Sequence, residues 1–63
     1  MKLAKGLKAA RESAGLSQAA LASKLGVAVS TVAGWELGTH GVRIDRLSKI
    51  AKVTGVDVAE LLG

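Results

Sequence analysis

Residues 17–36 contain two short apolar segments with helical spacing, separated by one glycine, Gly26. Ser17 stands where its hydroxyl can accept hydrogen bonds from the first amides of a helix, and Gly26 can adopt the left-handed conformation that commonly ends one. The second segment, about 28–37, continues with the same spacing. The inward positions of both segments are apolar: Leu21, Ala22, Leu25, Val32 and Trp35. This pattern predicts two short helices that meet at a tight corner.

Helical spacing continues on both sides of this corner. We expect a first helix over about residues 2–14, ended by Gly15, then a helix from about Ile44 to the stop at Gly55, and a short last helix. Their inward positions are Leu3, Leu7, Ala10, Ala14, Ile44, Leu47, Ile50 and Ala51. Gly6 is expected to weaken the first helix by about 1 kcal/mol relative to alanine. Because alanine and leucine favour helix and proline is absent, the chain is expected to be all-α with five helices.

The composition limits the domain organisation and the kinds of site. The 63 residues are expected to form a single domain, 1–63, that buries only roughly 60% of its unfolded surface. Cysteine is absent and His40 is the one histidine, so we expect no disulfide, metal site or cofactor. No apolar run approaches the roughly 20 residues of a membrane span, and no signal-peptide core is present, so a cytoplasmic protein of prokaryotic or phage type is expected. The net charge of +4 suits a polyanionic partner, and also simple solubility.

Nearly the whole chain matches one family pattern in register. Around the corner, the matching residues are Arg11, Gly15, Leu16, Ser17, Gln18, Leu21, Ala22, Leu25, Gly26, Val27, Thr31, Val32, Trp35, Glu36 and Gly38. A second block follows without insertion: Ile44, Leu47, Ile50, Ala51, Gly55, Val56, Leu61 and Leu62. In these positions the chain resembles the Cro and phage-repressor type of helix-turn-helix domain, also called Xre-like. The resemblance implies a compact lambda-repressor-like fold, and the function of a DNA-binding domain whose recognition helix, about 28–37, enters the major groove.

Five residues are expected to hold the corner together. Ala22 lies where two helices must approach closely, Gly26 lies where the backbone needs a positive φ, and Trp35 points inward. Arg11 and Glu36 both stand at the edges of apolar stripes. The resemblance implies a charge-assisted pair between them that joins the first helix to the third. The alternative is two exposed charges on separate surfaces.

The resemblance places phosphate contacts at the start of the second helix and after the third. Gln18 is the first residue of the second helix, where free amides suit an anion and the side-chain amide adds a donor. The alternative is a surface residue with good helix propensity. Thr39, His40 and Arg43 can reach the DNA backbone or the minor groove from the following loop. Lys24 is a further basic group that can hold a phosphate.

The outward side of the third helix carries few groups that can read a base. Its residues are Val29, Ser30, Ala33, Gly34 and Leu37, with Thr31 nearer the edge. None can form the bidentate contacts that Arg, Lys, Asn or Gln make with guanine or adenine. Val29 can touch a thymine methyl group, and Ser30 or Thr31 can form one ambiguous hydrogen bond. Gly34 is expected either to let the backbone approach DNA closely or to be a tolerated surface glycine.

These departures leave two alternatives to DNA binding open. Ala28 and Arg43 also stand where the family commonly has helix-capping residues. One alternative is therefore a designed or redesigned scaffold that keeps this fold and has no selected DNA-binding activity. The other is a protein-interaction module that receives a partner helix on Val29, Ala33 and Leu37.

The sequence favours binding over catalysis. Asp45, Asp57 and Glu60 all have helix-capping or surface explanations, so no nucleophile and base can be nominated. We expect no enzymatic activity, no small-molecule substrate and no membrane partner. Double-stranded DNA is the expected partner, and a homodimer would form through the region of Val56 and Val58, because relatives bind paired half-sites.

Overall fold

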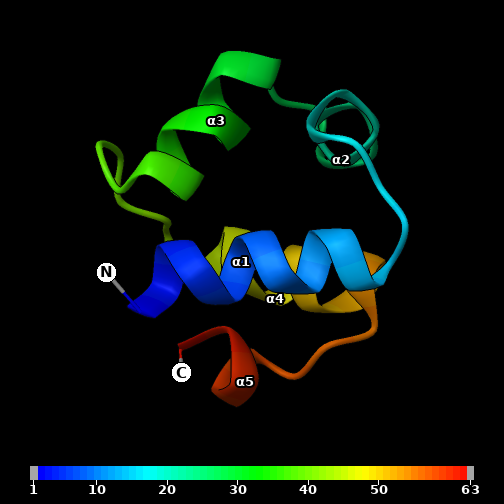
Figure 1. The fold of residues 1–63 in the computed structure, drawn as a ribbon, viewed down its shortest axis with the longest axis vertical. Helices are drawn as coiled ribbons and strands as arrows, with labels where there is room; N and C mark the ends of the chain where they lie inside the picture. Colours follow the sequence, from blue (N-terminus) through cyan, green and yellow to red (C-terminus); the bar gives the residue numbers. More distant parts are fainter. Residues whose placement is uncertain (1, 63) are drawn as a thin grey trace.

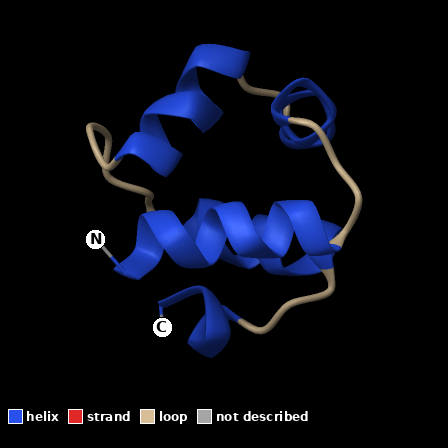
Figure 2. Cartoon of the chain, viewed as in Figure 1, coloured by secondary structure: helices blue, strands red, loops and turns tan. Residues whose placement is uncertain are grey.

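The computed structural model describes residues 2–62, which form five α-helices connected by short loops (Figure 1). These helices are α1 (Lys2–Ser13), α2 (Gln18–Leu25), α3 (Val29–Leu37), α4 (Ile44–Thr54) and α5 (Val58–Leu62). Every regular element in this part of the chain is helical (Figure 2). The expected all-α class, the five helices and their approximate bounds are confirmed.

The helix ends follow the expected local chemistry. The residues that end the first four helices all have a positive φ, between 71° and 79°: Gly15, Gly26, Gly38 and Gly55. At the start of α2, the Oγ of Ser17 accepts a hydrogen bond from the backbone N–H of Ala20 at 3.0 Å. Ala28 and Arg43 precede α3 and α4 without a side-chain capping hydrogen bond, as their residue types predict.

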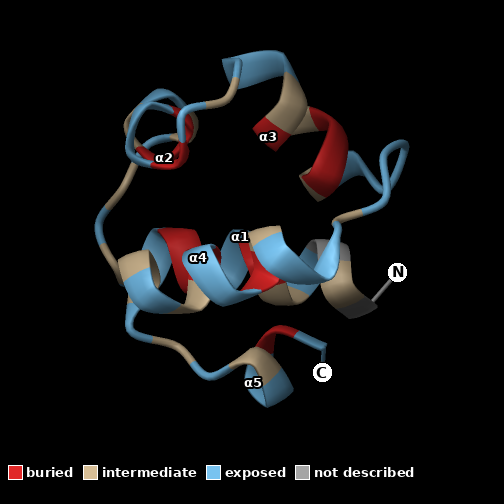
Figure 3. Cartoon of the chain, turned by 180° about the vertical axis from the view of Figure 1, so that it is seen from behind, coloured by how far each residue is buried: buried red, intermediate tan, exposed pale blue. Residues whose placement is uncertain are grey.

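The helices pack around one small core. α1 contacts α3, α4 and α5, while α2 contacts α3 and α4. In Figure 1, α2 is seen end-on while α3 runs across the view, so the two helices of the corner cross steeply. Every helix contributes a buried segment (Figure 3). The buried apolar residues are Leu7, Ala10, Leu21, Ala22, Leu25, Val32, Trp35, Leu47, Ile50 and Leu61.

One expected core residue lies outside. Ile44 is 83% exposed, although the sequence spacing placed it on the same face as Leu47 and Ile50. Ile44 is the first residue of α4, and side chains of a helix lean toward its N-terminus. Its side chain therefore extends past the packed part of the helix, and the prediction that it lies inward was wrong.

Gly6 is required by the packing of α1 against α5. A Cβ atom at this position would overlap the backbone carbonyl oxygen of Leu61. The overlap is with backbone, which cannot rotate away as a side chain can. Gly6 was expected only to weaken α1. Its missing side chain also allows α1 and α5 to approach closely, and the sequence did not indicate this role.

Candidate nucleic-acid interface

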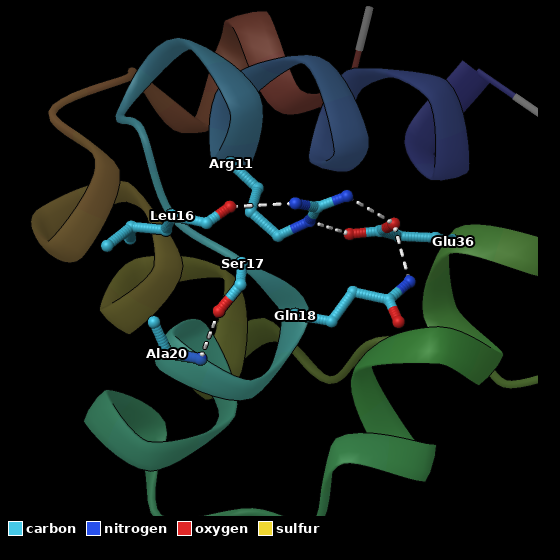
Figure 4. Close-up of polar contacts among 6 residues, drawn as sticks. All are labelled: Arg11, Leu16, Ser17, Gln18, Ala20 and Glu36. Atoms are coloured by element: carbon cyan, nitrogen blue, oxygen red, sulfur yellow. Dashed lines mark hydrogen bonds and ion pairs between the residues drawn. The ribbon is translucent and has the colours of Figure 1, made fainter.

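An ion pair between Arg11 and Glu36 connects α1 to α3 on the inner side of the corner (Figure 4). The Nε of Arg11 donates to Oε2 of Glu36 at 2.6 Å, and its Nη2 donates to Oε1 at 3.1 Å. Its Nη1 donates to the backbone carbonyl of Leu16 at 2.7 Å, just before α2. The pair is therefore bidentate, and Arg11 connects α1 both to α3 and to the loop that leads into α2. This confirms the expected pair and rules out two separate surface charges.

Both members of the pair are ionised at neutral pH. The hydrogen bond with Glu36 raises the pKa of Arg11 above its ordinary value, against the opposing effect of burial. Burial acts to raise the pKa of Glu36, whose side chain is 5% exposed, but the hydrogen bonds from Arg11 and Gln18 and the charge of Arg11 together lower that pKa. These contacts favour the ionised carboxylate of Glu36, because charge-assisted hydrogen bonds stabilise a buried negative charge.

Gln18 belongs to the same polar network. Its Nε2 donates to Oε1 of Glu36 at 3.0 Å, so one of its two amide hydrogens is held inside the corner (Figure 4). The second amide hydrogen and the backbone amides of Gln18 and Ala19 stay available to a ligand, whereas the amide of Ala20 is bonded to Ser17. Sequence reasoning placed Gln18 at the helix start correctly but gave no signal for its contact with Glu36.

The outward side of α3 is largely apolar and has no covering element. Val29 is 46% exposed and Leu37 is 77% exposed, while Ala33 between them is half-buried. Ser30 is exposed on the same side of the helix. Spacing of four residues places the three apolar side chains in one stripe. We call Val29, Ala33 and Leu37 the apolar stripe of α3.

Gly34 does not lie on this outward surface. It is buried, and the imidazole of His40 covers it, with Nδ1 2.7 Å from the place a Cβ atom would occupy. The carbonyl oxygen of Gly34 also accepts a hydrogen bond from Oγ1 of Thr39 at 3.2 Å. The outward position expected for Gly34 was wrong, because the loop after α3 folds back over it.

Two hollows flank α3. One of about 460 Å³ lies toward α1 and is lined by Lys8, Arg11, Glu12, Gln18, Ala33, Glu36 and Leu37. The other, about 420 Å³, lies under the loop after α3 and is lined by Val27, Ala28, Thr31, Trp35, His40, Gly41, Arg43 and Arg46. The structure thus brings Gln18 together with Ala33, and brings Thr31 together with His40 and Arg43. Lys24 is exposed near the end of α2 and lines neither hollow.

Arg46 connects α4 to the corner and was not singled out in the sequence. Its Nη1 donates to the carbonyl oxygen of Leu25 at 3.1 Å, at the C-terminal end of α2. A cation is favourable at that end of a helix dipole. The sequence contains no local signal for the contact, because the two residues come from different helices.

A helix-turn-helix family model matches residues 7–61, which contain the whole corner and the network beneath it. The chain belongs to the Xre/Cro-like helix-turn-helix family. This family consists of DNA-binding transcription regulators, which are generally not enzymes. The resemblance derived from the residues is thereby confirmed, together with the lambda-repressor-like fold.

A solved structure of apo-HppE is similar to this domain. The two chains superpose with a TM-score of 0.88 at 41% sequence identity, over 95% of this chain and 34% of the other. The chain therefore spans about a third of the length of that protein. A comparison with curated proteins gave no match.

Neither a metal-binding cluster nor a membrane-spanning helix is present in residues 2–62. No three His, Cys, Asp or Glu side chains in this range gather closely enough to hold a metal ion. No helix there is both long enough and apolar enough to cross a bilayer.

Proposed function

We propose that this helix-turn-helix domain is the DNA-binding part of a Cro/repressor-type transcriptional regulator, a cytoplasmic protein of prokaryotic or phage type. The observation that carries the proposal is the exposed, uncovered side of α3 with a hollow on each flank. In this reading α3 lies in the major groove, because a helix presented in this way fits its width.

Phosphate contacts from both flanks would fix α3 in the groove. Gln18 offers its second amide hydrogen beside the first backbone amides of α2, which suits a phosphate oxygen. Arg43 is exposed on the other flank, with only a 3.8 Å surface ion pair to Asp45 holding its guanidinium. Such an exposed pair contributes little, so a phosphate can compete for Arg43. Lys24, Thr39 and His40 are exposed and complete the proposed set.

A salt titration tests the proposal. Binding of the full chain to a fluorescent duplex should weaken linearly on a logarithmic salt scale, with a slope of about −2 if Lys24 and Arg43 each neutralise one phosphate. Arg43→Ala and Lys24→Ala should each reduce the steepness of the slope by about 1. Lys52→Ala, an exposed cation near the end of α4, is the matched control and should leave the slope unchanged. No binding at low salt would contradict DNA binding and leave a scaffold without that activity.

We also propose that the regulator binds paired half-sites as a dimer through the region of Val56 and Val58. Both residues are half-buried, and Val56 lines a hollow of about 240 Å³ between α1 and α5 that a second copy can enter. Sedimentation of the chain with a duplex carrying two half-sites one helical turn apart tests this. Two copies bound cooperatively support the dimer, and independent binding of single copies contradicts it.

A further inference from the structure

The outward side of α3 lacks every side chain that reads a base pair through two hydrogen bonds. Val29, Ser30 and Leu37 are exposed there, and Ala33, the middle residue of the apolar stripe, is half-buried. A serine hydroxyl can donate or accept, so it does not distinguish the four base pairs. Any direct discrimination between base pairs by this surface therefore has to come from apolar contact.

One apolar group is exposed in the major groove of ordinary DNA, the 5-methyl group of thymine. Val29 is the first residue of α3, the end that faces base edges when a recognition helix lies in the groove, and Ala33 follows one turn later at the middle of the helix. Their short side chains leave nothing that would hold the helix away from the bases. The stripe and the methyl group are thus matched in chemistry and in position.

The charges around the stripe also favour DNA over a protein partner. The hollow under the loop after α3 is lined by Arg43 and Arg46 and by no acidic side chain, whereas in the hollow toward α1 Lys8 and Arg11 are balanced by Glu12 and Glu36. Glu36 is neutralised by Arg11, and the chain as a whole carries a net charge of +4. An apolar stripe with a positively charged flank is complementary to methyl groups beside a phosphate strand.

We infer that α3 recognises duplex DNA through thymine 5-methyl groups, with Val29 and Ala33 as the specificity-determining residues. This inference rests on the proposed DNA-binding function. It predicts a preference for thymine-rich sites and indifference to the guanine and adenine hydrogen-bonding edges. Each methyl group buried against the stripe should change affinity about fourfold.

Binding to four duplexes, each about two helical turns long, isolates the effect of the methyl group from the effects of all other base atoms. The first alternates adenine and thymine, and the second replaces every thymine by uracil, which lacks only the methyl group. The third alternates guanine and cytosine, and the fourth carries 5-methylcytosine instead. Anisotropy titrations at low salt should show tighter binding to the first than to the second, and tighter binding to the fourth than to the third.

A mutant cycle distinguishes direct contact from effects of methylation on the duplex itself. Val29→Ala removes two methyl groups from a 46% exposed side chain, and should reduce the preference for thymine over uracil about fourfold. Val29→Ile and Lys52→Ala should both keep the preference. Effects of duplex stiffness are common to all variants and cancel in the comparison.

The outcomes separate this inference from the function on which it rests. Salt-dependent binding with equal affinity for thymine and uracil duplexes overturns methyl recognition and leaves DNA binding standing. A thymine preference that Val29→Ala does not change also overturns it, because the preference then comes from duplex shape. Absence of binding to all four duplexes overturns both proposals, and the stripe would then be a surface for a protein partner.

Discussion

The inner side of α3 is held by a buried polar network, whereas its outer side exposes apolar side chains that no other helix covers. On the inner side, Glu36 accepts three hydrogen bonds, two from Arg11 and one from Gln18, and so connects α1, α2 and α3. On the outer side, Val29 and Leu37 are exposed and contact no covering element. The inner side specifies one arrangement of the helices, since a buried ion pair tolerates little displacement. Residues on the outer side contribute little to the stability of the fold. They can therefore be replaced, and recognition changed, without unfolding the domain.

Loss of one member of the inner ion pair should produce the largest effect. Arg11→Ala leaves the Glu36 carboxylate buried without its main partner, which typically costs about 3–5 kcal/mol. A domain of this length has a total stability of only about 3–9 kcal/mol, so the variant should be largely or wholly unfolded at room temperature. Urea or thermal unfolding followed by circular dichroism measures the loss.

The matched control replaces both charges. Arg11→Met combined with Glu36→Leu removes the pair without leaving an unpaired charge, so it should recover much of the stability lost by Arg11→Ala. If Arg11→Ala alone costs less than about 1 kcal/mol, the inner side does not specify the fold as described.

Acid should reduce the stability of the domain by protonating Glu36, and by less than Arg11→Ala does. The pKa of Glu36 is lower in the folded chain than in the unfolded chain, so its contribution is complete above the unfolded value of about 4.3 and is lost as the pH falls through the folded value. In that window the unfolded state binds more protons. Unfolding curves recorded from neutral to acidic pH should therefore show a steeper decline for the unsubstituted chain than for Glu36→Gln. Equal pH profiles would contradict this role of Glu36.

A smaller effect, of opposite sign, is expected at the start of α3. Ala28 precedes the helix in an extended conformation, with φ −73° and ψ 151°, and makes no side-chain capping bond. Ala28→Ser supplies an acceptor for the first amides of the helix and should stabilise the domain by about 1 kcal/mol. Ser17→Ala provides the reciprocal control, because it removes the cap that α2 already has. A rise in melting temperature for Ala28→Ser and a fall for Ser17→Ala would confirm both.

The smallest effect is expected on the outer side. Leu37 is 77% exposed, so Leu37→Gln should change the free energy of unfolding by less than about 0.5 kcal/mol. Chemical denaturation is sensitive enough to bound this change. A loss comparable with that of Arg11→Ala would show that the apolar stripe supports the fold, and the contrast between the two sides would fail.

Local residue chemistry was sufficient to predict most of the fold. Gly15, Gly26, Gly38 and Gly55 mark helix ends by a backbone requirement that depends on neighbouring residues alone. The spacing of apolar residues likewise identified the core apart from Ile44. The helical period gives the direction of a side chain around the axis, but not whether another element reaches that part of the helix.

The candidate site was harder to predict wherever it depended on tertiary contacts. The pair between Arg11 and Glu36 was accessible because the family resemblance pointed to it. Gly34 was misplaced because its environment is created by His40, which folds back from the following loop. The contact of Gln18 with Glu36 and that of Arg46 with Leu25 each join separate helices, and no spacing within one segment can indicate them.

The contact between Gly6 and Leu61 has a consequence for the order in which the domain assembles. It joins residues from opposite ends of the chain, so nearly the whole length must close as one loop before it forms. The turn between α2 and α3 needs only neighbouring residues. We therefore expect the corner to form early from local contacts, and the joining of α1 to α5 to contribute most of the non-local cost that sets the folding rate.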